Sequence, residues 1–459
     1  MSDNMSNNRK NGPNRLYAIP FFLLLAILTV VSFIIPLRPT VSNMEKRELA
    51  TFPEFTLEAL LSGDYFDGIT LWFSDTFPGR EGWIQIATDT KSLYGYSEIS
   101  IQGDLGMTDV IPEETNAVSI QVTEGSLHTE ANGAISEEPE METTSAAEAP
   151  TEWGGVNAEE YEVSNSAIVQ IGDSAFNTLG FSKIYSDAYV NLINRFSDCV
   201  KNSDVRVISC IAPTAIGILV EPEYLSLFNS YSQADMLNYL HSNMNDEIVK
   251  VDTVSALLEH NDEYLFFRTD HHWTALGAYY SYCAMCEATG MEAAPLDSFR
   301  EWNQGDFKGS IYYQVKYPNK LKMDTVYAYV PDDDIEATHS SNGYYFTETE
   351  LIADRTTWDP NCRYLCFISG GTAITKLVNH DLPDAPNCVV VIDSFGNCFV
   401  PFLTQNYHTI YAIDYRKYRA MDLQRFCQQN DIDDVIVAPY MMATQSSLVE
   451  PLFQPLYGV

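Results

Sequence analysis

The residues best suited to chemistry lie in one short stretch, Phe266 to Thr274, where an acid and two imidazoles stand side by side. Asp270 and His272 are two positions apart, so in an extended backbone their side chains leave on the same side. A carboxylate placed in this way holds an imidazole in one tautomer and stabilises its charged form, which a general base needs when it takes a proton from a serine. The pattern therefore predicts a nucleophile elsewhere in the chain.

Two Asp-Ser pairs at the ends of apolar runs are candidates for that nucleophile. Ser394 follows the run 388–392, and Ser174 follows the run 167–171. A serine on a strand-to-helix turn can expose its hydroxyl beside helix-terminal N–H groups. The alternative interpretation of either pair is an ordinary helix N-cap, and one site needs only one nucleophile.

A metal site is the alternative interpretation of Asp270-His271-His272, because some phosphoesterases carry such a triplet. Those sites draw on further Asp and His ligands, whereas the other histidines of this chain have no ligand-like spacing. We therefore expect neither a metal ion nor another cofactor. The other histidines are His128, His241, His260, His339, His380 and His408.

Apolar runs typical of buried strands alternate with helical patterns after residue 163. This alternation predicts an α/β fold with a mostly parallel sheet and helices on both faces, in which sites collect at the carboxyl ends of strands. The expected strands are 167–171, 205–211, 364–368, 388–392, 409–413 and 434–438, and the expected helices are 187–200, 275–288 and 421–430.

Charge and cysteine content exclude several classes of protein. A formal net charge of -37 would repel nucleic acid and anionic membrane surfaces. The nine cysteines are an odd number scattered through apolar segments, so they predict no disulfide framework. Cys283-x-x-Cys286 has no second ligand pair, and we interpret it as two buried residues of a helix.

The N-terminus has the pattern of a signal anchor. Residues 1–15 are polar and basic, and residues 16–37 are apolar without a single charge, long enough to cross a bilayer. No small-x-small cleavage site follows, and the preceding bases favour a cytoplasmic N-terminus. We therefore predict a single-pass protein of the cell membrane with its main domain extracellular.

Three further segments follow the anchor. The prolines and aromatic residues at turn positions in residues 38–107 predict a structured stalk that packs on the main domain. Residues 108–162 predict a disordered acidic insertion, because from Ser92 to Ser182 there are seventeen Asp and Glu and no Lys or Arg. Residues 163–459 form the predicted α/β domain.

Several motifs together resemble one family. The stretch Thr269-Asp270-His271-His272-Trp273-Thr274 is similar to the signature of the DHHW family of bacterial envelope proteins. That family is related to the SGNH-fold O-acetyltransferase-like proteins of alginate and other exopolysaccharides. Further matches are the Asn-x-Glu-x-Arg-x-Leu and Phe-Pro elements at 43–53, the Asp-x-Phe-Pro-x-Arg element at 75–80, and the strand end Asp-Ser-Phe-Gly-Asn-Cys-Phe-Val-Pro-Phe-Leu at 393–403.

The resemblance implies an SGNH-hydrolase-like fold and a choice between the serines. In the family the Asp-x-His pair precedes the nucleophile, so Asp270 and His272 are paired with Ser394, and Ser174 becomes part of a structural turn. His271 is then a supporting neighbour, and Trp273 packs beneath the site.

One departure from the family concerns the oxyanion hole. The usual Gly-Gly-Asn is Gly370-Gly371-Thr372 here, which would weaken or retune the hole. The candidate donors are Gly371, Thr372, Asn397 and the N–H of Phe395.

The resemblance implies an extracytoplasmic O-acetyltransferase that moves an acetyl group through a serine acyl-enzyme to a cell-envelope or secreted polysaccharide. A multispanning membrane acyltransferase would supply the acetyl group, and no nucleic acid would be involved. Two alternatives remain open: a carbohydrate esterase with the same triad, and a catalytically silent scaffold that binds polysaccharide.

Overall fold

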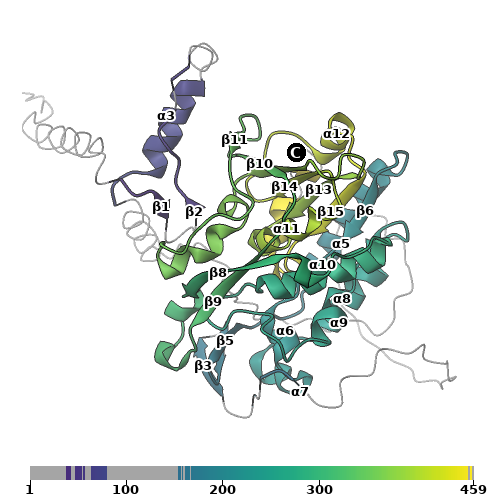
Figure 1. Ribbon diagram of the computed structural model, residues 1–459. Coiled ribbons are helices and arrows are strands. Elements are labelled where there is room, and N and C mark those ends of the chain that lie inside the picture. The colour runs from purple at the N-terminus through teal and green to yellow at the C-terminus, as the bar shows by residue number, and fades with distance from the viewer. Residues whose placement is uncertain are drawn as a thin grey trace, which may run out of the picture. The chain divides into compact units, whose positions relative to one another are not determined.

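The computed structural model describes residues 38–42, 47–53, 55–56, 64–79, 154–156, 158, 161–165, 167–452 and 455–456. The chain divides into two units, residues 1–100 and 101–459, which we describe separately (Figure 1). The predicted anchor at 16–37, the tail before it and most of the predicted insertion at 108–162 lie outside the described residues. Among the residues that are described, none of the helices combines the length and the apolar character needed to span a bilayer.

The first unit contains a short hairpin and one helix. Strand β1 (Val41–Ser42) pairs antiparallel with β2 (Arg47–Glu48), and α3 (Asp64–Asp75) follows. The guanidinium of Arg38 lies 3.8 Å from the ring centroid of Trp72 and donates to Thr76 Oγ1 at 2.6 Å. Phe52 meets the same Trp72 ring edge to face. These aromatic and cation–π contacts hold the described parts of this unit together.

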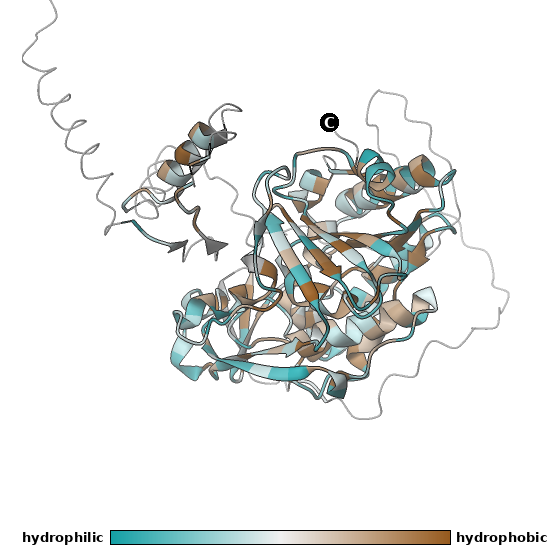
Figure 2. Ribbon diagram, turned by 45° about the horizontal axis from the view of Figure 1, so that its top comes forward, coloured by the Kyte–Doolittle hydropathy of each residue, from teal (hydrophilic) through white to brown (hydrophobic). Residues whose placement is uncertain are grey.

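The second unit is built on an eight-stranded sheet in the order β11-β10-β12-β14-β13-β15-β6-β7. Its middle strands are apolar and buried along most of their length, as strands covered on both faces must be, and apolar colouring gathers there in Figure 2. The strands are β6 (Arg206–Ser209), β7 (Val249–Lys250), β10 (Ile335–Ser340), β11 (Thr347–Glu348), β12 (Ile374–Asn379), β13 (Asn387–Ile392), β14 (Thr409–Asp414) and β15 (Asp434–Ala438).

The sheet is mixed, which corrects the prediction of a mostly parallel one. The pairs β14–β13, β13–β15, β15–β6 and β6–β7 are parallel. The pairs β14–β12, β12–β10 and β10–β11 are antiparallel. Neither β10 nor β12 was predicted, because their alternating polar residues lack the continuous apolar run of a strand buried on both faces.

Helices cover both faces of this sheet. The connections β13–α11–β14 and β14–α12–β15 run in opposite directions along the sheet, so right-handed crossovers place α11 and α12 on opposite faces. Helix α12 lies beside α5, joined by a hydrogen bond from Gln424 to Cys199 O, and α10 lies beside α11 through Tyr279 and Phe402. The helices are α5 (Lys183–Val200), α6 (Ala215–Leu219), α7 (Pro222–Leu225), α8 (Gln233–Ser242), α9 (Thr253–Leu258), α10 (Ala275–Thr289), α11 (Val400–Leu403), α12 (Leu423–Gln429) and α13 (Met441–Thr444).

Two smaller antiparallel sheets complete the second unit. One joins β3 (Tyr161–Asn165), β4 (Ile168–Ile171) and β5 (Ser174–Asn177), so the predicted strand 167–171 exists but is not part of the large sheet. The other is the hairpin of β8 (Arg300–Phe307) and β9 (Asp324–Val330). Val156 pairs with Val220 and β3 begins at Tyr161, so regular structure starts before the expected boundary at 163.

The strands predicted at 205–211, 388–392, 409–413 and 434–438 are confirmed within a few residues, as are the three predicted helices. The strand predicted at 364–368 is wrong. That segment forms the 3₁₀ helices η6 (Pro360–Cys366) and η7 (Ile368–Gly370), with Asp359 accepting from Asn361 N to cap the first. A short apolar run of this kind does not distinguish a strand from a buried helical turn.

An ion pair with a buried carboxylate joins β15 to the neighbouring strand β6. Asp434 in β15 accepts from Arg206 Nε and Nη2 at 2.8 and 2.7 Å and from the Tyr407 hydroxyl at 2.6 Å. We expect Asp434→Ala to lower the free energy of unfolding by roughly 2–4 kcal/mol, because the buried Tyr407 hydroxyl and the partly exposed Arg206 guanidinium lose this hydrogen-bond acceptor. Asp198→Ala is the matched control, since its pair with Lys201 is exposed and worth less than about 1 kcal/mol. Equal denaturant midpoints for the two variants would contradict this role.

Candidate active site

The Asp270-His271-His272 motif lies at the tip of a tight loop before α10. Phe266 and Trp273 form an antiparallel bridge across the loop, and Thr274 begins α10 by accepting from Gly277 N with its side chain. The tip is bent rather than extended, which corrects the geometry expected from the sequence. Asp270 and His272 meet because the Asp270 carboxylate accepts from the His272 backbone N–H, as in an Asx turn.

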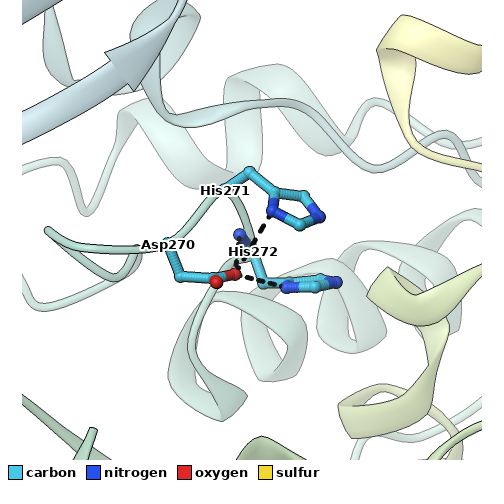
Figure 3. Close-up of side chains that lie close together, drawn as sticks. All are labelled: Asp270, His271 and His272. Atoms are coloured by element: carbon cyan, nitrogen blue, oxygen red, sulfur yellow. Dashed lines mark hydrogen bonds and ion pairs between the residues drawn. The ribbon is translucent and has the colours of Figure 1, made fainter. Parts of the chain in front are cut away.

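The Asp270 carboxylate is buried and fully hydrogen-bonded. Oδ1 accepts from His272 Nδ1 at 2.5 Å and from His272 N at 3.1 Å (Figure 3). Oδ2 accepts from Ser310 N at 2.6 Å. Burial by itself raises the pKa of this carboxyl, but the adjacent His271 and His272 and these hydrogen bonds outweigh it and lower the pKa well below its usual range. Asp270 is therefore ionised and only accepts hydrogen bonds.

Ionised Asp270 fixes the tautomer of His272. Because the carboxylate has no proton to give, Nδ1 of His272 must carry the proton of their shared hydrogen bond. The unprotonated Nε2 of a neutral ring then faces Ser394 Oγ, which lies 2.8 Å away. The structure thus brings together the three residues that the sequence paired, in one hydrogen-bonded series.

Ser394 is held where strand β13 ends. It opens the 3₁₀ helix η8 (Ser394–Cys398), which Asp393 caps by accepting from Phe395 N at 2.9 Å. The other oxygen of Asp393 accepts from Tyr440 N and from the Tyr415 hydroxyl, after β15 and β14. Asp393 thereby fixes the ends of three neighbouring strands around the serine. Burial raises the pKa of its carboxyl.

Two aromatic residues support the imidazole and the serine. The ring of Tyr364 stacks on His272 with centroids 4.4 Å apart, and its hydroxyl donates to Ser394 O at 2.8 Å. Burial raises the pKa of Tyr364 well above its usual value, so it remains a neutral donor. Trp273 lies beneath the site and donates from Nε1 to Phe395 O at 2.8 Å. Sequence reasoning does not find Tyr364, because the apolar run 364–368 predicts a strand.

A second buried carboxylate holds the loop that carries the motif. Asp324, at the start of β9, accepts from the backbone N–H groups of Arg268 and Thr269 and from the hydroxyls of Thr269 and Tyr264. Gly309 N donates to the Thr269 hydroxyl, and a methyl group on Gly309 would lie 2.1 Å from Asp270 Cβ. No spacing in the sequence signals these residues, which lie far along the chain from the motif.

His271 lies at the more exposed side of the motif. Its Nδ1 is 3.0 Å from Ser310 Oγ, and its ring centroid is 3.9 Å from that of His272. Among the described residues, Asp270, His271 and His272 form a group with three metal-ligand atoms within 4.8 Å of one another. Two ligands about 2.1 Å from one tetrahedral ion would be roughly 3.4 Å apart. The 2.5 Å between Asp270 Oδ1 and His272 Nδ1 is a hydrogen-bond distance, whereas Asp270 Oδ1 and His271 Nδ1 are 3.4 Å apart.

The four candidate oxyanion donors differ in availability. The Phe395 N–H is already used by Asp393, and the Thr372 hydroxyl points to Ile374 O and Thr375 Oγ1. Asn397 is buried, and within the described part of the chain its side-chain amide has no hydrogen bond. It lies three residues after Ser394 in a 3₁₀ helix, where side chains at this spacing eclipse. A methyl group on Gly371 would lie 3.9 Å from Asn397 Nδ2, so the two remaining candidates are neighbours.

The second Asp-Ser pair serves a turn. Gly172, with φ +57°, and Asp173 connect β4 to β5, and the Ser174 hydroxyl donates to Asp173 Oδ1 at 3.0 Å. Nε of Arg268 lies 3.8 Å from Oδ2 of the same Asp173 carboxylate.

The second unit is a mixed α/β fold whose loops bring Ser394, His272 and Asp270 together. The DHHW protein family model matches residues 45–413, and the chain belongs to this family. No curated protein sequence matches it.

Two solved structures with TM-scores above 0.5 share the fold. A DHHW family protein from Eubacterium siraeum is 24% identical with a TM-score of 0.57, covering 64% of this chain and 97% of its own. Bacillus cereus PatB1, solved with a sulfonyl adduct, is 17% identical with a TM-score of 0.51, covering 63% and 98%. The O-acetyltransferase domain of Pseudomonas putida AlgJ is 14% identical with a TM-score of 0.36, covering 61% and 92%.

The lowered pKa of Asp270 predicts how this residue affects stability with pH. A carboxyl whose pKa is lower in the folded state adds stability that is complete above its unfolded pKa, about 3.9, and is lost as the pH falls toward the folded pKa. The excess stability of the wild type over Asp270→Asn should therefore be constant down to about pH 5. Below about pH 4 it should shrink by up to ~1.4 kcal/mol per pH unit.

Asp324→Asn is the matched control for this measurement. Burial raises the pKa of Asp324, so its contribution has the opposite sign: the wild type should gain stability relative to this variant as the pH falls toward about 4. Denaturant unfolding of the three proteins across this pH range measures both slopes. Parallel slopes for the two variants would disprove the assignment of charge to Asp270.

Proposed function

We propose that this protein is an extracytoplasmic serine O-acetyltransferase that acetylates a polysaccharide. The observation that supports it is the series of Asp270, His272 and Ser394, with 2.5 and 2.8 Å between successive side chains. The acetyl group and the sugar acceptor are taken from the resemblance described in the sequence analysis, and membership of the DHHW family is consistent with that resemblance. The membrane anchor at 16–37 and a multispanning acyltransferase as the acetyl donor belong to the same proposal.

The proposed reaction has two halves. His272 Nε2 takes the proton of the Ser394 hydroxyl as Oγ attacks the carbonyl carbon of the donor's acetyl ester. The bond to the donor's oxygen breaks, and His272 returns the proton to that oxygen. A sugar hydroxyl then gives its proton to His272 and attacks the acetyl-serine, and the proton returns to Ser394. Asp270 stabilises the imidazolium in both halves.

The acylation half can be tested with an acetyl-ester reporter. We expect Ser394→Ala and His272→Ala in the full-length protein to lower turnover by about 10³-fold or more. Ser174→Ala is the matched control and should turn over like the wild type. Because PatB1 has been solved with a sulfonyl adduct, a sulfonyl fluoride should add its sulfonyl mass to the wild type and to Ser174→Ala. Labelling of Ser394→Ala would refute the proposed nucleophile.

Asn397 is proposed to donate to the oxyanion of both tetrahedral intermediates. Asn397 is 4% exposed, and its side-chain amide has no other hydrogen bond in the described part of the chain. It lies on the same side of η8 as Ser394. We expect Asn397→Ala to lower kcat by about 10²-fold while leaving KM for the reporter nearly unchanged, because the interaction forms in the transition state. An unchanged kcat would remove Asn397 from the mechanism.

Acceptor dependence separates transfer from hydrolysis. With the reporter and an oligosaccharide present, a transferase forms acetylated oligosaccharide, whereas a carbohydrate esterase releases only acetate. Mass spectrometry of the sugar after incubation with the wild type and with Ser394→Ala measures the difference. Acetate release without any acetylated sugar would contradict the transferase and favour the carbohydrate esterase.

A further inference from the structure

Three consecutive aromatic side chains are exposed on the loop between β10 and β11. Tyr344, Tyr345 and Phe346 are 63%, 56% and 40% exposed. Single exposed apolar residues are normal on a protein surface, whereas exposed apolar side chains gathered in one place can mark an interaction site. We call residues 341–346 the aromatic loop; it joins the strands labelled β10 and β11 in Figure 1.

The aromatic loop is internally braced. The Ser340 hydroxyl accepts from the N–H groups of Asn342 and Gly343, and the Asn342 side chain accepts from the N–H groups of Tyr344 and Tyr345. Its backbone is thus fixed by side chains of the loop and of the strand end that precedes it. Rings presented from a fixed backbone lose little entropy when they bind a ligand.

The aromatic loop is also fixed to a segment beside the candidate active site. The Tyr344 hydroxyl donates to Ala420 O at 3.1 Å, and a methyl group on Gly343 would lie 2.7 Å from Ala420 Cβ. The same segment, which follows β14, carries Lys417, whose ammonium donates to Gly371 O. The aromatic loop and the Gly371 neighbourhood of Asn397 are therefore connected through residues 417–420.

Sheet topology places the aromatic loop at the same end of the sheet as Ser394. Ser340 pairs with Ile374, Ile374 pairs with Ile413, and Val391 pairs with Ile413, so β10 ends where β13 ends. Three strand spacings separate these two ends, about 14 Å. That span corresponds to several linked sugar units and exceeds a single one.

We propose that the aromatic loop is a binding platform for an extended glycan acceptor, with the modified sugar at Ser394 and more distant sugars on Tyr345 and Phe346. The inference deepens the proposed function and rests on it. Aromatic rings stack on the C–H face of a pyranose, and the tyrosine hydroxyls add hydrogen bonds to sugar hydroxyls. Because the aromatic loop lies at the same end of the sheet as Ser394 but several sugar lengths away, an extended glycan could contact both, whereas a small acceptor could not.

The test is native gel electrophoresis of the full-length protein in gels that contain hydroxyethyl cellulose, xylan, galactomannan or alginate. We expect at least one polysaccharide to retard the wild type and the Tyr345→Ala/Phe346→Ala double variant to bind it about tenfold more weakly. Leu227→Ala is the matched control, because Leu227 is as exposed as Tyr345 but lies in η2 (Ser226–Phe228). Ser394→Ala should be retarded like the wild type.

The reporter assay distinguishes failure of this inference from failure of the proposed function. The double variant should hydrolyse a small acetyl ester at the wild-type rate, while its KM for an oligosaccharide acceptor rises and its KM for a monosaccharide does not. Wild-type retardation of the double variant, or no retardation of the wild type by any of the four polysaccharides, overturns the glycan platform. Loss of ester turnover in the double variant also overturns it, because the loop would then serve the triad itself.

Discussion

The site depends on the burial of the Asp270 carboxylate. A charge removed from water is tolerated only when its oxygens are hydrogen-bonded, and the donors here come from two separate segments, the motif itself and Ser310. Asp324, in strand β9, is a second buried carboxylate that needs hydrogen-bond donors, and it takes them from the loop that carries Asp270. The imidazole therefore acquires its orientation only when the loop before α10 and the β8–β9 region are packed together.

The second determinant is the convergence of strand ends. Asp393 joins the ends of β13, β14 and β15 through the N–H of Tyr440 and the hydroxyl of Tyr415, and this fixes the turn on which Ser394 stands. Parallel strands deliver such ends to one edge of a sheet, which is where ligand sites of α/β proteins collect. Tyr364 links the two halves of the site, because its ring stacks on the His272 imidazole and its hydroxyl donates to the Ser394 carbonyl.

The parallel centre of the fold was predictable from continuous apolar runs, and the pairing of Asp270 with His272 from their Asp-x-His spacing. The choice of Ser394 over Ser174 came from the family resemblance and not from a local pattern. The sequence did not predict β10 and β12, whose patterns alternate, or the 3₁₀ segment around Tyr364, whose apolar run imitates a strand. Asp324, Gly309 and Ser310 could not be found from local pattern at all. Their contribution is a long-range hydrogen bond or a close approach, which one sequence does not encode in any spacing.

The position of the last strand has a consequence for how the protein is made. Strand β15 lies between β13 and β6, so the last strand of the described residues is an interior one. Until residues 434–438 arrive, β6 and β13 each present an unpaired edge, and the two parts of the sheet have no strand in common. A chain without β15 would therefore expose two unpaired strand edges, each able to pair with another chain, so we expect its loss to cause aggregation rather than a local defect.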